Sequence, residues 1–448
     1  MESYIGAAPK SLISQLDFSV QSTAPYVLQR RSVRMYPSSA STFSSNTVNV
    51  ARITLASEGE WLDPSTLRFC CTIVNNDANR DIYPFSCSAA SLFQRVREEV
   101  GGSLISDVLN YARTAEMFQN KLEPAEWQFS EGVLGFAGSQ FGMADLNYER
   151  AAFGPFPAVT DAAGLKFCPA SRHPVPGRIL PNSSYTCLQR ILTGLVKSNK
   201  LIPLRVCPVT YSFHLEIPAN FCDPGYSQNY TLQNCYILCD LITLDSSIQN
   251  TYMKQLLSGS ALSVVIPSYI TVQYQVANAA SMAVIVQRAL TRCVAVFVSF
   301  STAASNVTQF VYPDENLTAA TNQHFDSPFL LDSNFSFQLQ LGSKLWPEQP
   351  MSSLTEMYET LRKAVGTHNQ DIKSISLDRV DYVNNSFILG VDLEKNLGDP
   401  FSSQNTRAGD VLSLRFNGIN NPAINSVYVT LIGSSVVEIR ETGAFVFD

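Results

Sequence analysis

Residues 209 to 217 decide the fold class, because their sequence, VTYSFHLEI, alternates apolar with polar side chains; the apolar positions are Val209, Tyr211, Phe213, Leu215 and Ile217. Successive side chains of a strand point to opposite faces, so this pattern predicts a strand with one buried and one solvated face. The same alternation recurs at 270–276 and 335–341, whereas 293–300 is apolar on both faces, as in a strand between two layers. The chain is therefore predicted to be all-β.

Two short helices are expected at equivalent places in the two halves of the chain. In the second half, a capping box at Ser353 to Glu356 precedes an apolar stripe that ends at Gly366. In the first half, a comparable stripe comprises Val108, Tyr111, Ala112, Ala115, Phe118 and Leu122. Each helix follows a strand that ends in Gly-Ser, at Gly102 and at Gly342, 240 residues apart.

The order of predicted strands repeats as well, because the helices are preceded by the strand pairs 48–55 with 67–74 and 270–276 with 293–300. Self-similarity of this kind indicates an internal structural repeat. We therefore expect three parts: an amino-terminal arm at 1–45, a first β-unit at 46–258 and a second at 259–448.

The two ends of the chain are expected to differ. The arm has no apolar period, and its arginines are predicted to meet an acidic partner or the genome; they are Arg30, Arg31 and Arg34. A frayed terminus without a role is the alternative. At the other end, residues 436–439 and 444–447 have the β-branched and aromatic composition of strands. We expect these final strands to belong to the core of the second unit.

A resemblance to a known family is carried by residues 184 to 204, SYTCLQRILTGLVKSNKLIPL, and by the long alternating strand that follows. This stretch and the doubled strand order resemble the double jelly-roll major capsid proteins of the lineage that includes polinton-like viruses, virophages and adenoviruses. The polinton-like virus and virophage group is the most similar. Residues 121–183 and 301–334 depart from the pattern and are interpreted as loops, the first of them on the exterior.

The resemblance implies two consecutive jelly-roll β-sandwiches with a few short helices. It implies a structural protein that forms homotrimers, which are pseudo-hexagonal capsomers tiling an icosahedral shell. Its partners would be itself, neighbouring capsomers, the penton and other minor capsid proteins, and its place would be the virion, assembled inside the host cell. It implies no enzyme, and we assign no catalytic, cofactor-binding or metal-ligating residue.

Composition agrees with this interpretation. Only 15% of the 448 residues are charged, against roughly 25% in an average soluble protein, which indicates surfaces hidden in contacts. The net charge of -7 argues against a chain that wraps nucleic acid with a broad basic field. No amino-terminal secretory signal is visible. The most apolar window, 281–300, holds Arg288 and Arg292, so we expect a buried strand there and not a membrane span.

Candidates for chemistry are few. Among ten cysteines, Cys235 and Cys239 are the best pair, since they share one face of a strand, but nothing nearby completes a metal site and core packing is the expected role. The carboxylates of Glu98 and Glu99, like those of Asp314 and Glu315, are adjacent in sequence and should point to opposite faces. The histidines are scattered, at His173, His214, His324 and His368.

Other classes stay open at this point. A single-jelly-roll capsid subunit of an RNA virus or a minor vertex protein is one alternative, but the arm is only weakly basic and the repeat favours two rolls. A carbohydrate-active enzyme built on β-sandwiches is another. A cell-surface adhesion protein is a third alternative. It is supported by six Asn-x-Ser/Thr glycosylation sequons, at Asn182, Asn229, Asn306, Asn316, Asn334 and Asn384.

Overall fold

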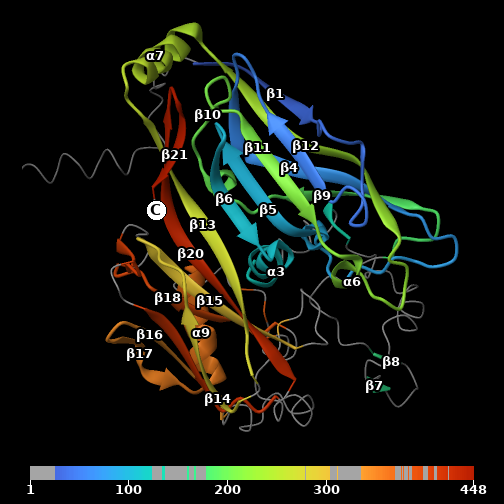
Figure 1. Cartoon of the computed structure of the whole chain (residues 1–448), viewed down its shortest axis with the longest axis vertical. Coiled ribbons are helices and arrows are strands. Elements are labelled where there is room, and N and C mark those ends of the chain that lie inside the picture. The colour runs from blue at the N-terminus through green and yellow to red at the C-terminus, as the bar shows by residue number, and fades with distance from the viewer. Residues whose placement is uncertain are drawn as a thin grey trace, which may run out of the picture.

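The computed structural model of the chain describes residues 26–123, 134–136, 159–160, 166–167, 178–277, 279–302, 310, 334–368, 375, 377, 382, 386–396, 402–407, 411–421 and 423–447. Most of the two predicted loops, 121–183 and 301–334, lies outside these residues, and so do residues 1–25 of the predicted arm. The described chain forms two β-sandwiches that lie against each other (Figure 1).

The first sandwich consists of two antiparallel sheets. One has the order β1 (Val27–Met35), β12 (Tyr230–Leu244), β4 (Trp61–Asn75) and β10 (Ile202–Pro203), with β2 (Thr42–Phe43) beside β12 and β9 (Ser184–Arg190) beside β4. The other has the order β3 (Val50–Leu55), β11 (Val209–Leu215), β5 (Phe93–Val100) and β6 (Ser103–Leu109). Residues 209–215 of the alternating stretch form β11, one of the two central strands of its sheet.

The second sandwich repeats this arrangement. Its first sheet has the order β13 (Leu262–Gln275), β20 (Ile424–Arg440), β15 (Cys293–Thr302) and β18 (Leu389–Asp392), with β21 (Gly443–Phe447) beside β20. Its second sheet has the order β14 (Ser281–Val286), β19 (Leu412–Asn417), β16 (Ser336–Leu341) and β17 (Lys344–Met351). A separate two-stranded ribbon is formed by β7 (Val159–Thr160) and β8 (Lys166–Phe167).

The predicted repeat is present, but its alignment was wrong by one strand. The sheet orders make β13 the counterpart of β1, and β14 the counterpart of β3. The predicted match of 48–55 with 270–276 therefore pairs β3 with β13, which are not counterparts. From there the two halves correspond: β4 with β15, β5 with β16, β6 with β17, β11 with β19 and β12 with β20. The apolar window at 281–300, predicted as one buried strand, contains two strands, β14 and β15, with Arg288 and Arg292 in the turn between them; β15 is buried, whereas β14 buries only Val284 and Val286.

The alignment failed because β1 carries no apolar period. Its register with β12 runs from Val27 opposite Leu244 to Met35 opposite Ile237. Residues 27–35 of the predicted arm are therefore part of the first sheet, held by the backbone ladder and by ion pairs. The Arg30 guanidinium lies 2.7 Å from Asp240 and 3.3 Å from Asp63, and that of Arg31 lies 2.6 Å from Glu60.

The helix predicted at the second Gly-Ser strand is confirmed as α9 (Leu354–Val365). Ser353 Oγ accepts a hydrogen bond of 3.2 Å from Glu356 N, and Gly366 ends the helix at a φ of 79°, a conformation that glycine adopts without strain. In the first half, α3 (Tyr111–Glu116) continues into η3 (Met117–Lys121), a π-helical turn, and Val108 is still in β6.

The remaining described helices are short or peripheral. They are η2 (Ala89–Leu92), η5 (Leu195–Lys197), α6 (Pro218–Phe221) and α7 (Ser246–Leu257). The stretch that carried the family resemblance forms β9 followed by η5 and β10. No helix among the described residues is long and apolar enough to cross a membrane.

Each sandwich has a hydrophobic core, and the two cores exchange residues. The core of the first includes Val264 and Ile266 of β13, Val437 and Ile439 of β20, and Ala444 of β21. The core of the second includes Met117 of η3. The final strands were predicted correctly as strands but assigned to the wrong core, because their buried face covers the first sandwich.

Candidate functional site

The cysteine pair singled out in the sequence lies in the first core. Cys235 and Cys239 are both on β12 and both buried. Burial raises the pKa of each thiol to about 12, so neither carries thiolate at neutral pH. Both are free thiols. The expectation that this pair serves core packing agrees with its position.

The adjacent carboxylates Glu98 and Glu99 point to opposite faces of β5, as predicted. Glu99 is on the outer face, 3.1 Å from the Arg52 guanidinium. Glu98 is fully buried and accepts hydrogen bonds from the Tyr211 hydroxyl, from Thr193 Oγ1 at 2.9 Å and from Leu195 N at 3.2 Å. Burial raises the pKa of Glu98 above its ordinary value. Its three donors tie β5 to β11 and to the turn before η5, which is a structural arrangement.

The described histidines are far from a catalytic arrangement. His214, on β11, has its pKa lowered, first by burial and then by the charges of Arg95 and Arg97. His368 follows α9, in the other sandwich. His173, His324, Asp314 and Glu315 lie outside the described residues. Among the residues that the structure describes, no group of three or more His, Cys, Asp or Glu side chains could hold a metal ion.

The most elaborate polar contacts lie at the junction between the sandwiches, where α3 of the first meets the sheet of the second that contains β13, β20 and β15 (Figure 1). Arg113 of α3 is buried, and its guanidinium donates to Ser299 Oγ at 3.1 Å and to Phe300 O at 2.9 Å, both on β15. It also lies 4.4 Å from the ring centre of Phe310 and 4.2 Å from that of Tyr428. Burial lowers the pKa of Arg113 to about 10, which leaves it charged at neutral pH.

The neighbouring residue extends this junction through hydroxyl groups. Thr114 Oγ1 lies 2.7 Å from Thr271 Oγ1 on β13, which in turn lies 2.9 Å from Thr430 Oγ1 on β20. Each hydroxyl can donate one hydrogen bond and accept another, so the row satisfies polar groups that are buried between α3 and the sheet of the second sandwich. The sequence analysis did not identify these junction residues. The one local signal was an arginine, Arg113, inside an apolar helical stripe, and its partners are nearly 190 positions away in the chain.

Backbone also approaches backbone at the junction. A Cβ atom at Gly194, beside η5, would lie 2.5 Å from the carbonyl oxygen of Pro267 and 2.8 Å from Cδ1 of Ile266, both on β13. Any other residue would force the two sandwiches apart. The edge strand β6 lies against β13 and β21 in the same region. The junction is thus a close-packed interface that rigidly joins the two sandwiches.

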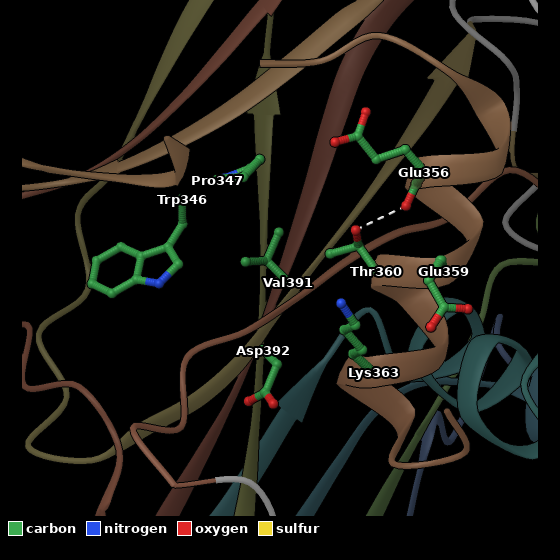
Figure 2. Close-up of a pocket in the computed structure, with 8 residues that line it drawn as sticks. All are labelled: Trp346, Pro347, Glu356, Glu359, Thr360, Lys363, Val391 and Asp392. Atoms are coloured by element: carbon green, nitrogen blue, oxygen red, sulfur yellow. Dashed lines mark hydrogen bonds between the residues drawn. The ribbon is translucent and has the colours of Figure 1, made fainter. Parts of the chain in front are cut away.

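The second sandwich has a helix, α9, at the place that corresponds to α3, and the surface around α9 is exposed. All six residues of α3 are buried, whereas α9 buries only Leu354, Met357 and Leu361. Between α9, β17 and β18 lies a groove of about 320 Å³, lined by Trp346, Pro347, Glu356, Glu359, Thr360, Lys363, Val391 and Asp392. Figure 2 shows Trp346 and Pro347 on one side, the helix residues on the other, and Val391 and Asp392 between them. Thr360 Oγ1 bonds back to Glu356 O at 2.8 Å.

No protein-family model and no curated protein sequence matches the chain. Solved structures do. PBCV-1 VP54, as fitted into a cryo-EM reconstruction of the virophage Sputnik, matches with a TM-score of 0.59 at 10% identity, over 96% of this chain and 99% of that one. The Faustovirus major capsid protein matches with a TM-score of 0.55 at 10% identity, over 96% and 97%. The Sputnik virophage structure solved by cryo-EM matches with a TM-score of 0.53 at 12% identity, over 97% and 91%.

The fold is the double jelly roll. The predicted fold class is therefore confirmed, and both sandwiches are jelly rolls that place their long strands in one sheet and their edge strands β6 and β17 in the other. The similarity spans nearly the full length of the chain and of its neighbours, so no large part of either lacks a counterpart. At a sequence identity near 10%, the architecture is shared although most aligned residues differ.

Proposed function

We propose that this chain is the major capsid protein of an icosahedral virus, a structural subunit and not an enzyme. The observation that carries the proposal is the full-length likeness to capsid subunits in both rolls and in their mutual arrangement. A fold by itself does not determine a function. Here, however, the likeness extends over both rolls, and the buried contacts of Arg113 and Thr114 hold the two rolls together as one unit.

Three copies would form a capsomer of six rolls with a pseudo-hexagonal outline. The two rolls repeat each other strand by strand, so each presents a similar wedge to its neighbours. The low charged fraction of 15% supports large lateral faces that lose water on assembly, because charged residues are depleted in the centres of interfaces. Neighbouring capsomers, a penton and other minor capsid proteins would be the further partners, and the virion would be the location.

The division into an arm at 1–45 and rolls at 46–258 and 259–448 enters this proposal with one change. Because β1 pairs with β12, the part of the chain that extends to a neighbouring subunit or to the inner shell surface would be residues 1–25. Arg30 and Arg31 are engaged within the chain and would contribute little to genome contact.

The test is the oligomeric state and shape of the purified full chain. Light scattering coupled to size-exclusion chromatography should give three times the chain mass of 49.3 kDa. Negative-stain electron microscopy should show a pseudo-hexagonal outline with a threefold axis. A stable monomer at micromolar concentration would contradict the proposal and favour an enzyme or a vertex protein.

A further inference from the structure

The junction inside the chain shows which surfaces of two rolls can pack against each other. The start of β13, the end of β20 and the strand β21 extend beyond the second roll and cover the β6 and η5 edge of the first. The contact uses different surfaces of the two rolls, a sheet end on one and an edge strand with its helix on the other. A contact of this kind is heterologous, so it leaves one surface of each type free.

The free sheet end belongs to the first roll. There, the start of β1 is the counterpart of the start of β13, and it is exposed: Tyr26 and Val27 are each 50% accessible and Leu28 is 63% accessible. In β13, by contrast, Val264 and Ile266 are buried against the other roll. Three consecutive exposed apolar side chains at a strand end are costly in water unless a partner covers them.

The free edge belongs to the second roll. β17 is the counterpart of β6, and most of its residues are exposed or half-buried. Beside it lies the groove against α9, the helix that corresponds to the fully buried α3. Trp346, Pro347 and Val391 give this groove apolar surface of the kind that an apolar strand end requires.

The groove and the strand β1 differ in the charged residues that they carry. The groove is lined by three carboxylates, of Glu356, Glu359 and Asp392, and by one cation, Lys363. The strand β1 carries only arginines as charged residues, at positions 30, 31 and 34. Arg30 and Arg31 are already paired with Asp240, Asp63 and Glu60 within the chain, so they add no positive field at the strand end, and the apolar surfaces carry the contact.

We propose that the apolar start of β1 in one copy docks into the groove between β17 and α9 of a second copy, repeating between chains the contact that β13 makes within one. Tyr26, Val27 and Leu28 would cover Trp346, Pro347 and Val391. This inference rests on the proposed function and assigns the surfaces through which the trimer closes.

The experiment compares the wild-type full chain with Leu28→Glu and with the matched control Ile285→Glu. Ile285 lies on β14, is 55% exposed, and is on neither proposed surface. Both substitutions change exposed side chains, so circular dichroism should report an unchanged fold. In parallel, Leu28 is replaced by the photo-crosslinking residue p-benzoylphenylalanine, and crosslinked peptides are identified by mass spectrometry.

The expected result is that Leu28→Glu raises the dissociation constant of the trimer on the order of tenfold or more, because a charge is placed in a buried contact, while Ile285→Glu leaves it unchanged. Crosslinks from position 28 should map to the peptides that contain Trp346 or Glu356 to Lys363 of another copy. A trimer with crosslinks elsewhere, or a Leu28→Glu trimer as stable as the parent, overturns this interface and leaves the proposed function intact. A monomeric wild type overturns both.

Discussion

Replacing Leu361 by Ala tests how α9 is held on the second roll. Leu361 is fully buried against β18, where Gly390 approaches it so closely that an added Cβ would lie 2.8 Å from Leu361 Cδ1. The substitution removes three carbon atoms at about 0.8 kcal/mol each, or roughly 2.4 kcal/mol of transfer free energy. The cavity left behind adds to this, so we expect the free energy of unfolding to fall by about 3–5 kcal/mol.

The contact with Gly390 turns this into a double-mutant cycle. Gly390→Ala alone should destabilise the roll, because its new methyl group collides with Leu361. In the Leu361→Ala background the collision with Cδ1 is gone and the methyl group fills part of the cavity, although Ala364 Cβ at 3.1 Å still limits the space. We therefore expect the double variant to be more stable than the sum of the two single effects predicts, by on the order of 1 kcal/mol.

Urea unfolding at one fixed chain concentration provides the assay, since oligomer stability depends on concentration. Circular dichroism follows the strands, and tryptophan fluorescence reports the three tryptophans, of which Trp346 lies beside α9. A Leu361→Ala chain that unfolds with the parent would refute the burial of α9. Additive effects within about 0.3 kcal/mol would refute the proposed collision with Gly390.

Three further predictions use the same assays. Removing residues 436–448 should abolish cooperative folding of both rolls; amide hydrogen exchange that still protects β5 would contradict this, because the first core would then be complete without the chain end. Glu98→Gln should remove a pH dependence of the stability. Because burial raises the pKa of Glu98, the folded chain holds a proton that the unfolded chain loses above about pH 4.3, so the stability of the wild type should fall relative to that of the variant as the pH rises from there. Stability curves that run parallel for the two chains would refute this. Arg113→Met should lower stability by roughly 1–3 kcal/mol through the acceptors on β15 that it leaves unpaired, and a variant that melts like the parent would show that they find other partners.

Local signals explain which elements could be predicted from sequence. The helix α9 was predicted from end to end because Ser353, Glu356 and Gly366 lie within or next to it, and β11 because its alternation is complete. The helix α3 was placed correctly, but its π-helical continuation η3 has no comparable local signature. Patterns of this kind report which face is buried and nothing about what covers it.

The missed features depend on residues far apart in the chain. β1 is polar and exposed, and its strand conformation comes from its ladder with β12, about 210 residues later. The final strands were assigned to the second core because sequence proximity was the only guide, whereas their buried face meets the first roll. The role of Arg113 was invisible for the same reason, since its acceptors on β15 are reached only after the two rolls have packed together.

The shared cores affect the order in which the chain can fold during synthesis. β12 ends at Leu244, yet the first core is completed only by side chains as late as Ala444, 200 residues further on. At roughly 5–20 residues per second, the ribosome needs about 10–40 s to supply them. The first roll must therefore wait, partly uncovered, until translation is nearly complete. Only full-length chains can then present finished surfaces, so truncated translation products are kept out of any assembly.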